Sequence, residues 1–202
     1  MARARADDYD DKRQAILDQS ARLFAIHGFD RASMSRIAEA CGVSKALLYH
    51  YYSAKDALLY DIVRSHLEHL IRVTTAASET EKSEAGAATP EDRLKALISA
   101  LLEAYRDADA QHKVQINHLS SLPDHQQSEL RAMERKLVKL FAESISAVHP
   151  SLKDSPKLKP VTMSLFGMLN WHYLWFQDGG DLSREDYAEM VMRLIADGAR
   201  NI

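Results

Sequence analysis

The sequence predicts an all-α protein, with an N-terminal three-helix domain that contains a helix-turn-helix and a C-terminal helical domain. Apolar residues recur at the i, i+3, i+4 spacing of amphipathic helices in successive segments of the 202-residue chain. The segments are separated by glycine, by proline, or by a hydroxyl residue with a carboxylate three positions later, which are signals of helix ends and starts. No segment alternates apolar and polar residues as a half-buried strand does.

The composition limits the classes of protein to consider. Hydrophobic residues make up 46% of the chain and charged residues 27%, which suits a protein with a packed core. No run of 18 apolar residues predicts a membrane span, and the first residues lack the apolar stretch of a secretory signal. The single cysteine, Cys41, rules out an internal disulfide and fits a reducing compartment. We therefore expect a cytoplasmic protein without membrane contact.

The N-terminal residues predict an arm followed by a helix. Residues 1–10 lack periodicity and mix arginine with aspartate, so we expect a flexible arm, in which Arg3 and Arg5 are alternative minor-groove contacts. Residues 12–27 predict a helix that ends at Gly28. The inward face of this helix consists of Ile16, Leu17, Ser20, Leu23 and Phe24.

Residues 33–55 predict two short helices joined by a turn, inside a domain that spans residues 11–56. The hydroxyl of Ser33 can cap the first helix, and Ser44 can cap the second. Between them, Gly42 suits the left-handed conformation through which a chain leaves a helix. This arrangement is a helix-turn-helix, whose second helix can enter the major groove of DNA.

The rest of the chain predicts a second domain, residues 57–202, made of amphipathic helices. The sequence Thr89-Pro90-Glu91-Asp92 combines a cap, a proline at the first helical position and carboxylates in the first turn. Ser183 and Asp186 give a similar signal before the last helix. The predicted helices cover residues 54–78, 90–106, 109–119, 123–148, 161–177 and 183–199.

The helix-turn-helix stretch resembles the DNA-binding domain of the TetR/AcrR family of bacterial transcriptional repressors. The resemblance covers residues 12–64 and rests on Gly28-Phe29, Ser33, Ile37-Ala38, Gly42-Val43-Ser44, Leu48-Tyr49, Tyr51-Tyr52, Lys55 and Leu58-Leu59. It implies a homodimer that binds a palindromic double-stranded DNA operator. It also implies a C-terminal domain whose small-molecule effector releases the DNA.

Polar and small residues of the two short helices are the candidate DNA contacts. Lys45 can donate to guanine O6 or N7, and Ala46 and Leu47 can meet thymine methyl groups. The hydroxyl, imidazole and cationic groups around them suit phosphate oxygens, whereas Tyr52 is expected to pack inside the domain. The predicted DNA-binding set is Ser33, Ser35, Arg36, Ser44, Lys45, Ala46, Leu47, Tyr49, His50, Tyr51 and Lys55.

The resemblance also implies that the last two helices form the dimer interface as a four-helix bundle. Residues 161–176 carry more hydrophobic side chains than one core face needs, and some of these side chains are alternatively intramolecular core. The candidate interface residues are Leu165, Met168, Leu169, Tyr187, Met190, Val191 and Leu194.

Residues 167–188 resemble a pattern in TetR-type repressors of fatty-acid, steroid and phenylacetate catabolism, whose effectors are acyl-CoA thioesters. An acyl-CoA site needs an apolar slot, aromatic or arginine contacts to the adenine, and cations for the phosphates. Trp171 and Trp175 lie i, i+4 on one predicted helix and are alternatively core or interface. A hydrophobic or aromatic drug is the alternative effector. The predicted ligand-binding residues are Tyr105, Arg106, His112, Lys113, Asn170, Trp171 and Trp175.

Enzymatic and metal-dependent functions find little support in the sequence. It contains neither a glycine-rich phosphate loop nor a nucleophile elbow nor a Glu-x-x-His pair. His66 and His69 lie i, i+3 on one predicted helix, where we expect a solvated surface, since no third metal ligand is evident. We therefore predict no catalytic residues, no metal site and no cofactor.

Overall fold

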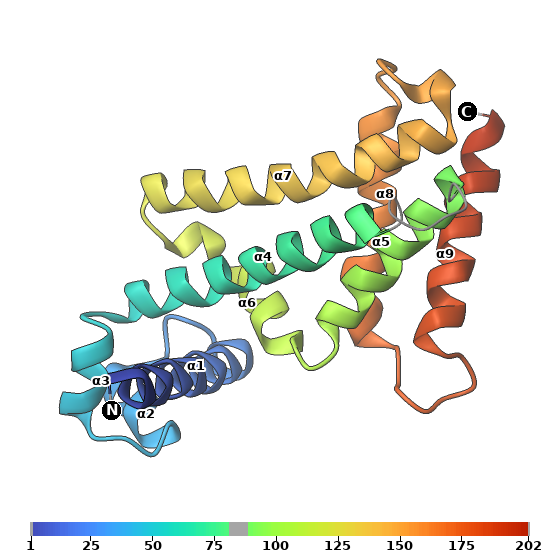
Figure 1. Ribbon diagram of the computed structural model, residues 1–202. Coiled ribbons are helices and arrows are strands. Elements are labelled where there is room, and N and C mark those ends of the chain that lie inside the picture. The colour runs from blue at the N-terminus through green and yellow to red at the C-terminus, as the bar shows by residue number, and fades with distance from the viewer. Residues whose placement is uncertain (1, 81–88, 202) are drawn as a thin grey trace. The chain divides into compact units, whose positions relative to one another are not determined.

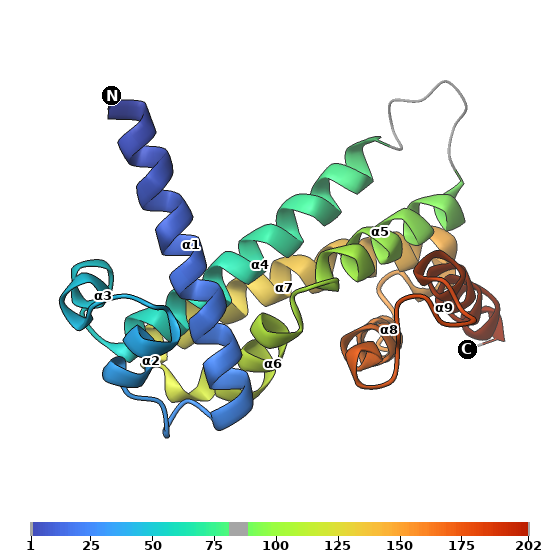
Figure 2. The same cartoon turned by 90° about the horizontal axis from the view of Figure 1, so that it is seen from below.

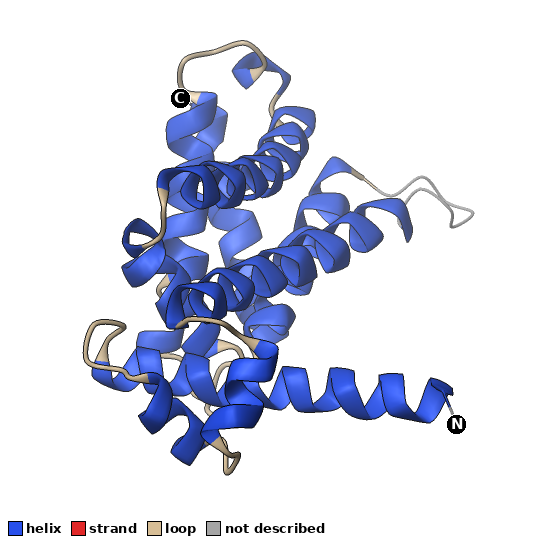
Figure 3. Cartoon of the chain, turned by 90° about the vertical axis from the view of Figure 1, so that its left-hand side faces the viewer, coloured by secondary structure: helices blue, strands red, loops and turns tan. Residues whose placement is uncertain are grey.

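The computed structural model describes residues 2–80 and 89–201, and every regular element in these ranges is helical (Figures 1 and 3). The predicted all-α fold is confirmed. No helix in the described ranges has both the length and the apolar character that crossing a membrane requires. The α-helices are α1 (Ala2–His27), α2 (Met34–Ala40), α3 (Lys45–Tyr51), α4 (Lys55–Thr80), α5 (Pro90–Tyr105), α6 (Asp109–His118), α7 (Asp124–Val148), α8 (Leu158–Asn170) and α9 (Arg184–Gly198). Short 3₁₀ turns are η1 (Leu119–Ser121), η2 (Pro150–Leu152), η3 (His172–Leu174) and η4 (Ala199–Asn201).

The chain forms two compact units. The first contains the residues up to Leu67 together with Asp107–Arg131, and the second contains Glu68–Arg106 together with the residues from Ala132 onward. Helices α4 and α7 contribute one part to each unit. The two units are groups of residues in mutual contact and are not defined by function. The boundary predicted at residue 56, between a DNA-binding and a ligand-binding domain, therefore stays a prediction.

Helix α1 begins at Ala2, which corrects the expectation of a flexible arm over residues 1–10 and a helix from residue 12. Met1 lies outside the described residues. The run Ala-Arg-Ala-Arg-Ala consists of strong helix formers, so the backbone continues as a helix without an apolar face. Hydrophobic periodicity reports burial, and for that reason it does not detect this part of α1.

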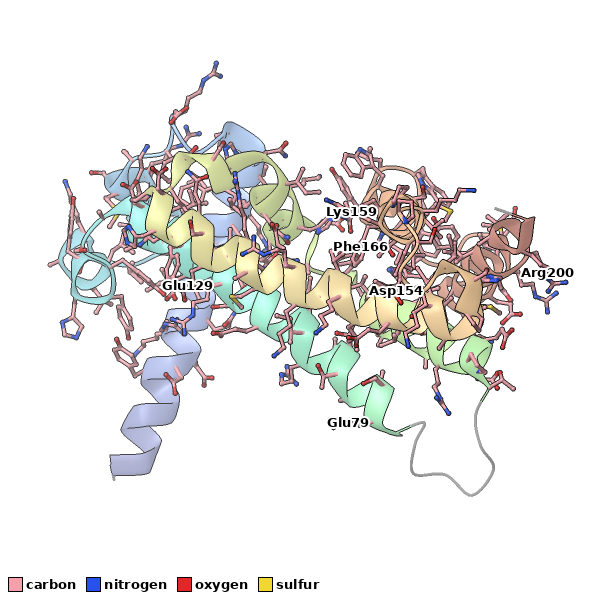
Figure 4. All side chains as sticks on the ribbon, turned by 90° about the horizontal axis from the view of Figure 1, so that it is seen from above. Glu79, Glu129, Asp154, Lys159, Phe166 and Arg200 are labelled. Atoms are coloured by element: carbon pink, nitrogen blue, oxygen red, sulfur yellow. The ribbon has the colours of Figure 1, made fainter. Side chains whose placement is uncertain are left out.

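The core of the second unit is an apolar cluster formed by α5, α7, α8 and α9 with the end of α4. Helices α8 and α9 lie side by side (Figure 2). The rings of Phe141 and Phe166 meet edge to face, with 5.1 Å between centroids. On α8, Lys159 is exposed in the first turn, while Phe166 packs into the core (Figure 4).

Two predicted helix starts are confirmed in atomic detail. The hydroxyl of Thr89 accepts from the backbone N–H of Asp92, and the Asp92 carboxylate accepts from the N–H of Thr89, so the two residues form a reciprocal capping box. Ser183 accepts from the N–H of Asp186 at the start of α9. These local signals place α5 and α9 correctly because they satisfy the orphan donors of the first turn.

The helix predicted over residues 161–177 is wrong at both ends. Helix α8 already begins at Leu158, because Pro160 lies in its first turn, where a missing N–H costs nothing. It ends at Asn170, and the chain continues as the 3₁₀ turn η3. Trp171 and Trp175 therefore do not share one α-helix.

Candidate nucleic-acid interface

Two serine caps build the helix-turn-helix. The Ser33 hydroxyl accepts from the backbone N–H of Arg36 at 3.3 Å, and the Ser44 hydroxyl accepts from the N–H of Leu47 at 3.1 Å. Gly42 adopts a left-handed conformation with φ of +64°, and the N–H of Val43 returns to the carbonyl of Ala38. Helix α2 therefore ends sharply and α3 begins three residues after the glycine.

Helix α3 has one buried residue, Leu48, and one half-buried residue, Tyr51, and its other side chains are exposed. Leu48 has no exposed surface, and on α2 the side chains of Ile37 and Ala38 are also buried. The side chains of Ser44, Lys45, Ala46, Leu47, Tyr49 and His50 are all exposed. Because α3 is seven residues long and held mainly through Leu48, it leaves two turns of helix accessible, as a helix that enters a groove requires.

Lys45 and Arg36 each lie close to a neighbouring ring. The Lys45 ammonium lies 5.9 Å from the centroid of the Tyr49 ring. The Arg36 guanidinium lies 3.0 Å from Nε2 of His27, and both side chains are exposed. Ser33 and Ser35 are exposed beside Arg36. This surface thus offers hydroxyl and cationic donors in the combination that phosphate binding needs.

Lys55 makes contacts within the N-terminal domain that the sequence did not predict. Its ammonium donates to the backbone carbonyls of Phe29 and Asp30, at 3.0 and 3.4 Å, and lies 4.2 Å from the centre of the Phe29 ring. Lys55 therefore clamps the start of α4 to the turn after α1. These bonds use two of the three ammonium donors, so the DNA contact predicted for Lys55 stays a prediction.

The C-terminal end of α3 is held by α1 and α4. Tyr51 is half-buried, and its ring stacks on the ring of Tyr9. Tyr52 is buried, as predicted, and its hydroxyl donates to Asp61 at 2.8 Å, while Arg13 donates to the same carboxylate. Burial, together with the hydrogen bond to Asp61, raises the pKa of Tyr52 above its usual value. Sequence reasoning missed Tyr9, Arg13 and Asp61 because their contacts lie far apart in the chain.

Two predicted ligand-binding residues meet in the second unit. The Tyr105 hydroxyl donates to the side-chain oxygen of Asn170 at 2.9 Å, which joins the end of α5 to the end of α8. Tyr105 is buried, and burial, with a smaller effect of the Glu134 charge, raises its pKa. The pair is thus a neutral hydrogen-bonded contact inside the domain.

Three other predicted ligand residues make contacts of their own or lie on α6. Arg106 is exposed, and its guanidinium pairs with Glu103 at 2.8 Å. His112 and Lys113 belong to α6 in the first unit, where the ring of His112 packs against that of His66 with 6.0 Å between centroids. His66 is buried, which corrects the expected solvated surface.

Trp171 and Trp175 are exposed, with 49% and 54% of their surface accessible. The Trp175 ring meets the Tyr187 ring edge to face at 5.1 Å. Arg184, which the sequence did not single out, fixes this region because it donates to Nε2 of His172 and to the carbonyl of Leu102, each at 3.0 Å.

Four predicted interface residues pack within the chain instead. Leu165, Leu169 and Val191 have no exposed surface, and Tyr187 is 4% exposed. All four belong to the apolar core of the second unit. Leu165, Leu169 and Val191 are removed from the interface set, because a side chain without accessible surface cannot contact a second chain, and Tyr187 has almost no surface to contribute.

Other apolar side chains of α8, η3 and α9 are exposed. Met190 and Leu194, both predicted, are 42% and 55% exposed, whereas Met168 is half-buried against the core. Met163 and Leu174 are 49% and 62% exposed, and the sequence did not predict them as interface residues. We refer to Met163, Leu174, Met190 and Leu194 as the apolar face.

The second unit also contains a groove of about 250 Å³ between α4 and α7. Its lining includes Ile71, Leu137 and Leu140, with Lys136 and Lys139 at the rim. Within the described residues, no three potential metal ligands gather. The groove is slightly smaller than a usual pocket for a whole drug-sized ligand.

Comparison with family models assigns both parts of the chain. A model described as "Bacterial regulatory proteins, tetR family" matches residues 16–62, inside the stretch that carries the sequence resemblance. A second model, described as "Tetracyclin repressor-like, C-terminal domain", matches residues 87–199.

Known proteins resemble the chain over most of its length. The HTH-type transcriptional repressor KstR2 of Mycolicibacterium smegmatis is 24% identical over 194 residues, which are 93% of this chain and 90% of that protein. The chain spans only 40% and 43% of two other curated relatives that it matches.

Two solved structures resemble this one. A TetR-family transcriptional regulator from Bordetella parapertussis is 30% identical with a TM-score of 0.82, and the match covers 94% of this chain and 96% of the other. The structure of AibR in complex with isovaleryl coenzyme A and operator DNA is 25% identical with a TM-score of 0.74. The match covers 91% of this chain and 97% of the AibR chain.

Proposed function

The chain belongs to the tetR family of bacterial regulatory proteins, and from this premise we propose that it is a transcriptional repressor. It binds a palindromic operator as a homodimer and leaves the DNA when an acyl-CoA thioester binds. The observation that carries the DNA-binding part is the exposed surface of α3, which the Ser44 cap begins and the buried Leu48 anchors. In the alternative effector class, a hydrophobic or aromatic drug releases the DNA instead.

Helix α3 reads base edges with its N-terminal half. Lys45 donates to guanine, and the apolar atoms of Ala46 and Leu47 contact thymine methyl groups. The remaining polar side chains bind phosphates and set the register, and they are Ser33, Ser35, Arg36, Ser44, Tyr49, His50 and Tyr51. Since α3 lacks Arg, Asn and Gln, few base contacts form, and the shape of the DNA contributes to specificity.

The apolar face pairs two copies of the chain. A single recognition helix reads too few base pairs, and a two-fold dimer presents two of them about 34–36 Å apart, at one turn of DNA. The exposure of Met190 and Leu194 on α9 and of Met163 on α8 supports this interface. Charged residues flank the α9 part, where Glu189 and Arg193 lie beside the two apolar side chains.

The effector is proposed as an acyl-CoA. The support is the likeness to AibR, which was solved with isovaleryl coenzyme A, and the pattern around Asn170 and Trp171. The groove between α4 and α7 supplies an apolar floor for a short acyl chain, and Lys136 and Lys139 supply cations for phosphates. Release follows if the effector prefers the arrangement that does not fit DNA, with a coupling energy of about 1–3 kcal/mol.

A gel shift on the DNA that flanks the protein's own gene tests the proposal. We expect a discrete complex that isovaleryl coenzyme A dissolves, whereas coenzyme A and free isovaleric acid leave it intact. A complex that only an aromatic drug dissolves would favour the alternative effector class. Absence of any sequence-specific complex would contradict the repressor itself.

A further inference from the structure

One turn of α1 contacts two consecutive residues at the end of the recognition helix. The rings of Tyr9 and Tyr51 stack, with 4.6 Å between centroids and 24° between planes. Arg13 follows Tyr9 at i+4, on the same side of α1. Arg13 binds Asp61, and the same Asp61 oxygen accepts the hydroxyl of Tyr52. Residues 9 and 13 of α1 thus fix residues 51 and 52.

The two contacts of α1, that of Tyr9 with Tyr51 and that of Arg13 with Asp61 and Tyr52, differ in how much they contribute to the stability of the fold. The contact at Tyr52 is structural, because Tyr52 is 6% exposed and Asp61 would otherwise be a partly buried, unpaired carboxylate. Tyr9, by contrast, is 41% exposed and lies outside the packed faces of the three helices. The stack adds little to the packing of the core. Its main effect is therefore to fix the side-chain conformation of Tyr51.

The position of Tyr51 explains why its conformation matters. Tyr51 is the last residue of α3, and its neighbours Tyr49 and His50 are exposed on the candidate DNA surface. The Tyr51 ring also meets the ring of His50, its neighbour on α3, edge to face with 5.8 Å between centroids. The stack on Tyr9 restricts the side-chain torsions of Tyr51 before DNA arrives, and such pre-organisation improves affinity without adding a contact.

We propose that Tyr9 is a positioning residue for operator binding, which holds the Tyr51 ring where its hydroxyl donates to a DNA phosphate. This inference rests on the proposed function, since it takes Tyr51 as a phosphate contact. The first part of α1, before residue 12, projects past α2 and α3 (Figure 2). This part of the helix thereby gains a role in which Tyr9 does not need to touch DNA.

A double-mutant cycle in the full-length protein tests the role of the stack. The variants are Tyr9→Ala, Tyr9→Phe, Tyr51→Ala and the double alanine variant, and the operator Kd is measured by fluorescence anisotropy from about 50 to 200 mM salt. We expect Tyr9→Phe to bind like the wild type, because the stacked ring remains. Tyr9→Ala should bind about 3- to 10-fold more weakly, and the double variant no more weakly than Tyr51→Ala.

The salt dependence separates positioning from disruption of α3. A neutral hydroxyl releases no counterion, so the slope of log K against log salt should stay unchanged in Tyr9→Ala. A reduced slope would show that cations were displaced as well, and it would overturn the proposal. Additive losses in the cycle would show that Tyr9 acts independently of Tyr51, and would overturn the proposal too. A Tyr9→Phe loss as large as that of Tyr9→Ala would overturn it as well, because it would place the Tyr9 hydroxyl on DNA.

A measurement without DNA keeps this inference distinct from the proposed function. In protein with ¹³C-labelled tyrosine, the Tyr51 ring signals should carry a ring-current shift that disappears in Tyr9→Ala and persists in Tyr9→Phe. Wild-type protein that shows this shift but binds no operator would contradict the proposed function, while the stack stands. An unshifted Tyr51 in wild-type protein would remove the stack itself, and with it the proposal.

Discussion

Arg184 donates a hydrogen bond from Nη1 to Nε2 of His172 at 3.0 Å, and this contact joins the start of α9 to the turn that follows α8. Nδ1 of His172 lies 2.9 Å from the carbonyl of Leu169, so Nδ1 carries the proton and Nε2 accepts. Arg184 also donates to both carboxylate oxygens of Asp178 and to the carbonyl of Leu102. The guanidinium therefore fixes the chain between α8 and α9.

Replacing Arg184 with alanine should destabilise the protein by about 2–4 kcal/mol, because a largely buried guanidinium with several acceptors is lost. The Arg184 side chain is only 12% exposed. Urea unfolding measures the effect, and Arg193→Ala, beside the proposed dimer interface, is compared in parallel, since the Arg193 side chain is 70% exposed and pairs with Glu189 on the surface. Equal losses in the two variants would contradict this role of Arg184.

Leu47 and Leu48 give a matched test of how α3 is anchored. Leu48→Ala should cost about 2–4 kcal/mol of unfolding free energy, because Leu48 is fully buried. Leu47 is 36% exposed, and its alanine variant should stay within about 1 kcal/mol of the wild type. Thermal unfolding followed by circular dichroism distinguishes them. The reverse order would mean that α3 presents a different face.

Lys45→Ala should weaken operator binding by about 1–3 kcal/mol while the dimer stays intact. The salt slope should also fall if the ammonium releases a counterion from the duplex. Anisotropy titrations give both quantities. The control is Lys159→Ala, which removes an equally exposed lysine from α8 (Figure 4). Unchanged affinity of Lys45→Ala for specific DNA would remove Lys45 from the contacts.

Alkaline pH should weaken the hydrogen bond from Tyr52, at the end of α3, to Asp61 of α4. The pKa of Tyr52 is raised in the folded protein, so its contribution to stability is complete below the unfolded pKa of about 10 and is lost as pH rises toward the folded pKa. Unfolding free energies from pH 7 to pH 11 should therefore fall more steeply in wild type than in Tyr52→Phe. This comparison isolates Tyr52 from the other tyrosines. Parallel curves would contradict the assignment.

Leu194→Glu should convert the dimer to monomers, because it places a charge in the proposed interface. Ile116→Glu is the control, since Ile116 is 38% exposed on α6 and is not one of the residues of the apolar face. Sedimentation velocity at micromolar concentration distinguishes the two variants. If Leu194→Glu stays dimeric, another surface pairs the chains.

Local signals in the sequence predicted much of the fold and of the candidate DNA surface. Thr89, Ser183, Ser33 and Ser44 identify helix starts because a cap acts within one turn, and each of these caps is present. Gly42 marks the turn because its conformation has a positive φ. Such features require no knowledge of the tertiary structure.

Other features depend on residues that meet only in the folded chain. The end of α8 at Asn170 lies within a run, residues 161–177, that contains no proline and no Asp, Glu, Lys or Arg, and Arg184 from the next helix holds the turn that follows. Both faces of α8 carry apolar residues, so periodicity did not distinguish the buried Leu165 from the exposed Met163. The Tyr9 contact with Tyr51 also has no local signature.

The affinity of the protein for a palindromic duplex from its own upstream region tests the central claim most directly. The measurement is the Kd and stoichiometry, by anisotropy and sedimentation, over a range of salt concentrations. We predict two chains per duplex, an affinity that falls steeply with salt, and loss of specific binding when Lys45 and Tyr51 are both replaced by alanine. Specific binding that survives this double replacement, or one chain per site, would contradict a dimer that reads DNA through α3.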